Sequence, residues 1–117
     1  MVGKDLTDLL REIRAEKRRY HEDVWKYVRA IRDLVRHQDP SARVLLFGSF
    51  VKSSMRPDSD IDVLIITGEA AYLDRRISLR AGIARELGEV TPFQIHIVTP
   101  EEYVGWYRRF IDRYEEV

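Results

Sequence analysis

The chain has 117 residues, a length that suits one ordinary domain, and its hydrophobic fraction of 44% is enough to build a core. Because 20 basic residues balance 20 acidic ones, no global positive field exists to attract nucleic acid. The absence of cysteine excludes disulfide bonds and thiolate metal sites. No signal-peptide pattern and no apolar run of membrane-spanning length is present, so we expect a soluble cytoplasmic protein.

The first 40 residues predict a long helical extension. Apolar side chains from Leu6 to Val35 recur mostly at steps of three and four, the spacing of one helix face, and Pro40 ends the pattern. The stretch RAEKRR (residues 14–19) offers no apolar anchor, so the helix either runs through it in solvent or breaks into two. A straight helix of this length would measure about 50 Å. We therefore expect one end to overhang the domain or to meet a partner.

Three apolar runs predict the core strands, at residues 43–47, 61–66 and 93–98. An amphipathic helix is expected over residues 70–87, with Gly88 as its stop. The run TPEE (residues 99–102) indicates a strong helix start with a capping box, and this last helix would extend over residues 99–117. Its expected apolar face carries six large residues, and any exposed part of that face would suit a partner: Tyr103, Trp106, Tyr107, Phe110, Ile111 and Tyr114.

The order α-β-loop-β-α-β-α predicts one α/β (α+β) domain over residues 1–117. It would contain a small mixed β-sheet of about three core strands packed with helices. Residues 1–40 form the helical extension, residues 41–98 the core, and residues 99–117 the C-terminal helix.

The stretch LFGSFVKSSMRPDSDIDVLII (residues 46–66) carries the candidate chemistry. Gly48 lets the backbone turn sharply after the first strand, and a short helix beginning at Ser49 would offer its N–H groups to phosphate. Asp60 and Asp62 stand two apart at the second strand, so both lie on one face. Two adjacent carboxylates repel unless a cation lies between them, and Mg²⁺ prefers such oxygens together with substrate phosphates. This combination is what phosphoryl or nucleotidyl transfer requires.

A structural explanation treats RPDSD (residues 56–60) as a turn and strand entry. It accounts for Asp58 and could account for Asp60, but it explains Asp62 poorly, because an aspartate within an apolar strand needs a burial partner.

The pattern Gly-Ser-x10-Asp-x-Asp resembles the signature of the DNA polymerase beta nucleotidyltransferase superfamily. The length and element order look like its minimal nucleotidyltransferases (MNT), small chains that are often paired with HEPN-domain proteins. The resemblance covers residues 43–98 and implies the nucleotidyltransferase fold. It also implies that Gly48, Ser49 and their backbone bind the triphosphate of an NTP such as ATP, and that Asp60 and Asp62 hold Mg²⁺ or Mn²⁺.

Three polar residues in the same loop are further candidates for nucleotide binding. Lys52 and Arg56 could clamp the triphosphate, and Ser59 could orient Asp60 through a local hydrogen bond. The plain alternatives are a solvated lysine or arginine and a turn serine.

The resemblance also implies a third carboxylate on the next core strand, where it would complete the metal site and help to deprotonate the attacking hydroxyl. Residues 93–98 contain no acidic residue, and His96 stands near the expected position, on one face with Gln94. A neutral imidazole can accept a proton but supplies no negative charge for Mg²⁺. Three interpretations stay open for His96: a general base, the mark of a weakened enzyme, or a buried structural histidine.

We therefore expect a Mg²⁺-dependent enzyme that transfers NMP, AMP from ATP in the first instance, to a hydroxyl of a partner protein. The resemblance implies the role of antitoxin in a HEPN/MNT toxin–antitoxin pair. The partner would be a HEPN-domain-like helical protein or further copies of the chain, without direct binding to nucleic acid or a membrane. The alternative is a weakened or inactive nucleotidyltransferase-fold module that binds and neutralises a partner, which His96 favours and the intact Ser49, Asp60 and Asp62 oppose.

Overall fold

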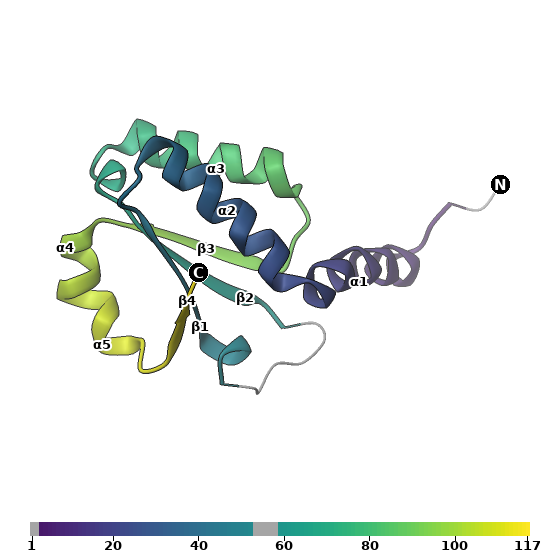
Figure 1. The fold of residues 1–117 in the computed structure, drawn as a ribbon. Helices are drawn as coiled ribbons and strands as arrows, with labels where there is room; N and C mark the ends of the chain where they lie inside the picture. The colour runs from purple at the N-terminus through teal and green to yellow at the C-terminus, as the bar shows by residue number, and fades with distance from the viewer. Residues whose placement is uncertain (1–2, 53–58) are drawn as a thin grey trace.

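The computed structural model describes residues 3–52 and 59–117, in which a four-stranded mixed sheet lies at the centre (Figure 1). The strand order is β3-β2-β1-β4. Strand β1 pairs antiparallel with β2 and with β4, whereas β2 and β3 run parallel. The strands are β1 (Arg43–Phe47), β2 (Ile61–Ile66), β3 (Phe93–Val98) and β4 (Tyr114–Glu116). The mixed sheet with its helices confirms the predicted fold class, and the first three strands have the predicted bounds.

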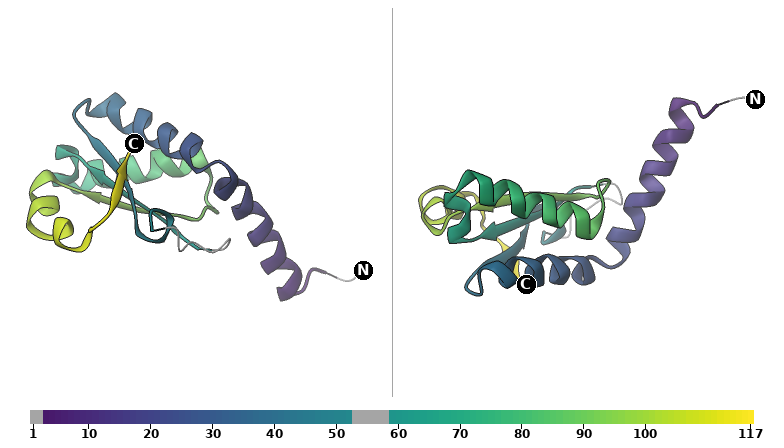
Figure 2. Two further views of the ribbon diagram at one scale, coloured as in Figure 1. Left: turned by 60° about the horizontal axis from the view of Figure 1, so that its bottom comes forward. Right: turned by 90° about the horizontal axis from the view of Figure 1, so that it is seen from above.

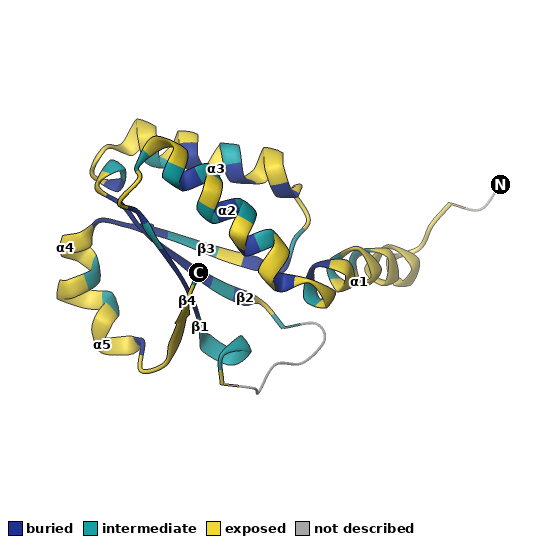
Figure 3. Ribbon diagram, in the orientation of Figure 1, coloured by how far each residue is buried: buried dark blue, intermediate teal, exposed yellow. Residues whose placement is uncertain are grey.

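Both faces of the sheet are covered, because β1 and β2 are apolar on both sides. Helices α2 (Val24–Gln38) and α3 (Leu73–Leu87) cover one face, and the C-terminal segment covers the other (Figures 1 and 2). Alternate strand residues divide between the two layers, Val44 and Val63 toward the helices and Leu45 and Leu64 toward the C-terminal segment. Figure 3 shows these central strands as buried. Each buried Val or Leu contributes about 1.5–3 kcal/mol to folding.

The N-terminal extension consists of two helices rather than one. Helix α1 (Leu6–Glu22) begins at the N-cap Asp5, whose Oδ1 accepts a hydrogen bond from the backbone N–H of Asp8 at 2.8 Å. It ends at Asp23, where φ −145° and ψ 58° are not helical, and α2 follows. The break therefore lies after the stretch at residues 14–19. Helix α1 projects from the domain and buries only Tyr20, so the expected overhang is present (Figures 1 and 2).

The predicted end of α3 at Gly88 and the predicted helix start after β3 are confirmed. A 3₁₀ turn, η2 (Gly68–Ala71), precedes α3, which therefore begins a few residues later than predicted. Gly88 caps the end of α3 with φ 104°, in the region that favours glycine. The capping box is complete, because Thr99 Oγ1 accepts from the Glu102 N–H at 3.0 Å and Glu102 Oε1 accepts from the Thr99 N–H at 3.1 Å.

The C-terminal helix is shorter than predicted, and the prediction that it reaches residue 117 is wrong. It consists of α4 (Pro100–Glu102), a π-helical turn η3 (Tyr103–Tyr107) and α5 (Arg108–Phe110). The chain then extends and pairs with β1 as β4, which also removes Tyr114 from the helix. An unpaired edge of β1 would leave backbone groups without partners, and Arg43 fixes the pairing through two hydrogen bonds to the Glu116 carboxylate at 2.6 and 3.3 Å.

The π-helical turn divides the predicted aromatic face of the last helix. Tyr103 and Tyr107 pack against the sheet, whereas Trp106 and Phe110 are 61% and 66% exposed. The rings of these two exposed residues lie 5.0 Å apart. In the part of the chain that the structure describes, no helix is long and apolar enough to cross a membrane.

Candidate functional site

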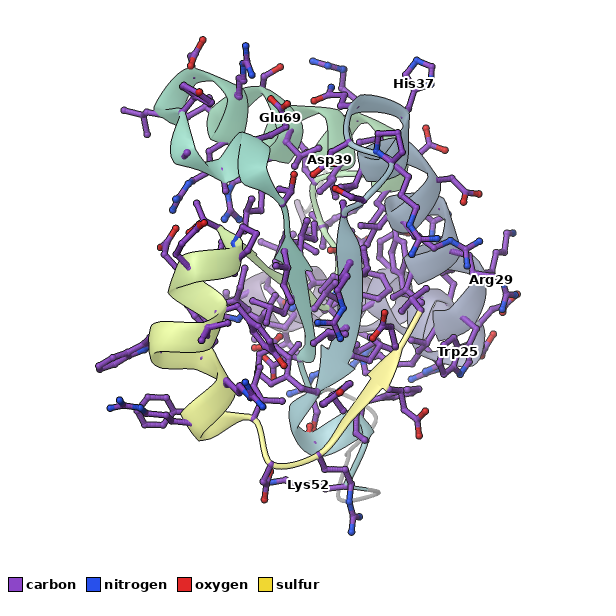
Figure 4. All side chains as sticks on the ribbon, turned by 60° about the vertical axis from the view of Figure 1, so that its left-hand side comes forward. Trp25, Arg29, His37, Asp39, Lys52 and Glu69 are labelled. Atoms are coloured by element: carbon purple, nitrogen blue, oxygen red, sulfur yellow. The ribbon has the colours of Figure 1, made fainter. Side chains whose placement is uncertain are left out.

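The Gly-Ser turn and the two aspartates meet at one end of the sheet. Strand β1 ends at Phe47, its antiparallel partner β2 begins at Ile61, and the register places Phe47 opposite Asp62. Gly48 and Ser49 follow at once in the 3₁₀ turn η1 (Gly48–Phe50). Figure 4 shows Lys52 at this end of the sheet and Asp39 at the opposite end. The sheet thus brings together two groups that are more than ten residues apart in the sequence.

Gly48 is required at its position for two separate reasons. Its φ of 76° lies in the left-handed region, which residues with a Cβ rarely adopt. A Cβ on Gly48 would also overlap with Oδ2 of Asp62 and lie 3.2 Å from the Asp62 Cγ. The backbone at Gly48 therefore passes directly over the Asp62 carboxylate, which confirms the predicted sharp turn and explains why no larger residue fits.

Asp62 is the only residue of β2 that is not fully buried. Its side chain is 31% exposed, and burial raises the pKa of its carboxyl above the ordinary value. His96 opposes this rise in pKa by its charge and hydrogen bonding, and the nearby charge of Asp60 adds to it. A half-buried carboxylate that is costly to ionise gains from a neighbouring cation.

His96 lies on β3 beside this carboxylate. Its Nε2 is 3.7 Å from Asp62 Oδ1, and its side chain is 35% exposed, so His96 is not a fully buried structural histidine. The imidazole lies between two aromatic rings, with centroid distances of 5.6 Å to Phe47 and 6.2 Å to Tyr107. The rings limit how the imidazole can turn, while its Nε2 remains near Asp62.

Asp60 directly precedes β2 and is exposed. Its Oδ2 accepts a hydrogen bond from Nε2 of Gln94 at 3.3 Å. The register of β2 and β3 places Gln94 directly opposite Asp62. The sequence prediction left Gln94 out of the site, although its position on the same strand face as His96 was a signal that could have included it.

The remaining candidates for nucleotide binding differ in their surroundings. Nζ of Lys52 lies 3.2 Å from Oδ1 of Asp112, in the turn that leads to β4, and both side chains are largely exposed. Ser49 is half-buried in η1, and Ser59 is half-buried immediately before Asp60. Arg56 falls outside the described residues, as does Asp58.

The donor set at this end of the sheet suits a hard divalent cation. Asp60 and Asp62 provide carboxylate oxygens, and Gln94 provides a side-chain amide, whereas thiolates are absent from the sequence. Mg²⁺ and Mn²⁺ prefer such oxygen ligands. Over residues 3–52 and 59–117, no three His, Cys, Asp or Glu residues are grouped so as to hold a metal ion. The two aspartates are therefore the charged donors of the candidate site.

A sheet that places a Gly-Ser turn beside two carboxylates has the parts that phosphoryl or nucleotidyl transfer requires. The family comparison agrees, because the model of the nucleotidyltransferase domain family matches residues 28–115. The chain belongs to this family. The match begins within α2, so α1 lies before the family domain.

Two solved structures share the fold. One, described as a "putative nucleotidyltransferase", has a TM-score of 0.65 and 26% identity, and the alignment covers 77% of this chain and 96% of that one. The other, a "putative nucleotidyltransferase from Sulfolobus solfataricus", has a TM-score of 0.53 and 17% identity, with 99% and 90% of the two chains covered, which shows the fold alone. No curated protein matches the chain.

Proposed function

We propose that the chain is a Mg²⁺-dependent nucleotidyltransferase that transfers NMP, AMP from ATP in the first instance, to a hydroxyl group. The observation that carries the proposal is the close approach of the Gly48 backbone to Asp62, with Asp60 beside it. A structural turn needs neither a half-buried carboxylate nor a glycine fitted against it. Membership in the nucleotidyltransferase domain family supports the class of reaction.

Each part of the site has a role in this reaction. The hydroxyl of Ser49 and the backbone N–H groups of η1 would bind the triphosphate, since such groups favour phosphate oxygens. Asp60 and Asp62 would hold Mg²⁺, which when bound offsets the negative charge of the triphosphate and of the departing pyrophosphate. The exposed Lys52 could exchange its contact with Asp112 for a phosphate oxygen.

His96 would act as the general base. The acceptor hydroxyl attacks the α-phosphorus in line, its oxygen forms the new P–O bond, and its proton passes to His96. The bond from the α-phosphorus to the bridging oxygen breaks, and pyrophosphate leaves with that electron pair. Asp62, 3.7 Å from Nε2, would stabilise the imidazolium that forms.

The acceptor in this proposal is a hydroxyl on a partner protein. Two surfaces that the domain does not bury support a protein partner. The first is the exposed pair Trp106 and Phe110, and the second is the projecting α1 with its exposed Leu6 and Leu9. The resemblance to minimal nucleotidyltransferases leads us to include a HEPN-domain-like helical protein as the acceptor, with the chain as antitoxin of the pair. Further copies of the chain are the other candidate partner.

The second candidate function is a module that binds a partner without transferring a nucleotide. The observation in its favour is that β3 presents His96 where the family resemblance implies a third carboxylate. A site with two carboxylates offers a divalent cation less negative charge than a site with three, and it therefore binds the cation more weakly. This candidate keeps the fold and the partner surfaces but not the chemistry.

Calorimetry of ATP binding in the presence of Mg²⁺ separates the two functions. We expect the wild type to bind and Asp60→Asn/Asp62→Asn to lose about tenfold or more in affinity. Asp33→Asn/Asp74→Asn removes the same charge from exposed helix positions and should bind as the wild type does. A wild type that binds no ATP at concentrations of about 1 mM would refute the transferase and leave the binding module.

Transfer itself is tested with ATP labelled at the α-phosphorus and with candidate partner proteins as acceptors. We expect His96→Ala to bind ATP as the wild type does but to lose transfer by about 10²-fold or more, because a positioned base contributes about 10²–10⁴-fold. Equal transfer by wild type and His96→Ala would exclude His96 as the base.

A further inference from the structure

A glutamine amide bridges two strands at the candidate cation site. Gln94 of β3 lies opposite Asp62 in the parallel register, and its Nε2 donates to Oδ2 of Asp60 at 3.3 Å. The Gln94 side chain is exposed, so water could have satisfied its amide equally well. The amide therefore contacts the Asp60 carboxylate although burial does not force it there, and its strand position lies opposite Asp62.

The chemistry of this amide suits a divalent cation. A glutamine side chain carries a donor nitrogen and an acceptor oxygen on one carbon, and a half turn about its last bond exchanges them. Mg²⁺ and Mn²⁺ accept a neutral carbonyl oxygen as a ligand. His96, the next residue on the same face of β3, offers a nitrogen instead, and that nitrogen lies near Asp62 rather than Asp60. Gln94 is therefore better suited than His96 to supply the third protein oxygen.

We propose that Gln94 is the third protein ligand of a divalent cation held by Asp60 and Asp62. The inference rests on the proposed function, because it requires that the two aspartates bind the cation. With Gln94 as a ligand, the site would have two negative charges, from Asp60 and Asp62, and one neutral oxygen. A carboxylate at position 94 should then increase affinity for the cation, since the number of charged ligands sets the strength of such sites.

The composition of the chain allows a direct spectroscopic test. The sequence contains two glutamines, Gln38 and Gln94, and no asparagine, so a proton–nitrogen correlation spectrum shows only two side-chain carboxamide pairs. Gln94→Ala removes one pair and assigns both. Gln38 ends α2 and precedes the start of β1, at the opposite end of the sheet. We expect Mg²⁺ to shift the Gln94 pair selectively and Mn²⁺ to broaden it more strongly than the Gln38 pair.

Affinity is measured with Mn²⁺ alone, and again with Mn²⁺ and ATP, through the paramagnetic resonance signal of the free ion. We expect Gln94→Ala to weaken binding about tenfold and Gln94→Glu to strengthen it about tenfold. Gln38→Glu is the matched control, because it adds the same charge far from the site and should change affinity by less than about twofold. Thermal unfolding without metal shows whether each variant is folded.

The outcomes separate this inference from the proposed function. If the wild type binds Mn²⁺ but Gln94→Glu and Gln38→Glu affect affinity equally, Gln94 is not a ligand, and the proposed function survives. If the wild type binds the cation but Mg²⁺ does not shift the carboxamide signals of Gln94, Gln94 is again not a ligand, and the proposed function survives. A wild type that binds Mn²⁺ neither alone nor with ATP overturns both proposals.

Discussion

Replacing Gly48 with alanine tests whether the Gly-Ser turn is fitted to the Asp62 carboxylate. The added methyl group has two costs. An L-residue at φ 76° costs about 1–2 kcal/mol, and relief of the overlap with Asp62 requires the carboxylate to leave its rotamer, at about 0.5–1.5 kcal/mol. We expect Gly48→Ala to lower the free energy of unfolding by about 2–3 kcal/mol, which is a fall in Tm of about 10 °C for a domain of this size.

The same substitution should also affect the site. The atoms that a Cβ would meet all belong to the Asp62 side chain, so this side chain must yield rather than the backbone. A displaced carboxylate loses its part in cation binding. We expect Gly48→Ala to weaken ATP binding in the presence of Mg²⁺ by about tenfold or more, measured by calorimetry well below the lowered Tm.

Two other glycines separate backbone strain from damage to the site. Gly88 has φ 104°, but a Cβ there would meet the Tyr20 hydroxyl, so Gly88→Ala should lose stability and keep full ATP affinity. Gly82 lies within α3, where a Cβ would make only ordinary van der Waals contact with Leu34 and Arg85 at 3.8–3.9 Å, so Gly82→Ala should be neutral or stabilising by up to about 1 kcal/mol. If Gly48→Ala matched the wild type in Tm and in ATP binding, the reasoning on the close approach would be refuted.

Two further predictions concern the half-buried carboxyl of Asp62 and the buried hydroxyl of Tyr20. Because burial raises the pKa of Asp62, the folded state favours its protonated form, and the ionised carboxylate costs stability as the pH rises from the ordinary value of 3.8 through the raised pKa. Near pH 7, Asp62→Asn should therefore unfold at a higher temperature than the wild type. Below pH 3.8 the two proteins should unfold at the same temperature. A lower Tm of the variant at pH 7 would contradict this reasoning. Tyr20→Phe removes the hydroxyl that donates to the buried Leu87 carbonyl and should cost about 1–3 kcal/mol in chemical denaturation, whereas the exposed Tyr72→Phe should cost nothing measurable.

The parts of the fold that the sequence predicts well are those with a strong local pattern. Strands β1, β2 and β3 have their predicted bounds because each is a largely apolar run bordered by a turn or cap residue, with Gly48 after β1, Asp60 before β2 and Thr99 after β3. The capping box at Thr99 and the stop at Gly88 are likewise local chemistry. Gly48 and Asp62 lie close together because β1 and β2 are adjacent antiparallel strands, so the end of β1 meets the start of β2.

The features that the sequence does not predict depend on contacts between distant residues. Strand β4 has the sequence YEE, which lacks an apolar alternation, and it exists because β1 offers an edge and Arg43 pairs with Glu116. The contact of Gln94 with Asp60 and that of Lys52 with Asp112 also join residues far apart in the chain. The break at Asp23 follows from tertiary anchoring, because Tyr20 packs against Tyr27 and Phe93 just before it.

The C-terminal segment lies on the same sheet face as the candidate site and forms one of its walls. Tyr107 of η3 borders His96, and the Lys52–Asp112 pair joins the end of the Gly-Ser turn to the turn before β4. One turn of helix separates Tyr107 from the exposed Phe110. A protein that bound the exposed aromatic pair would therefore touch the same short segment that borders His96. This proximity is the physical reason why a partner brought to this surface would also lie close to the residues proposed to act on its hydroxyl group.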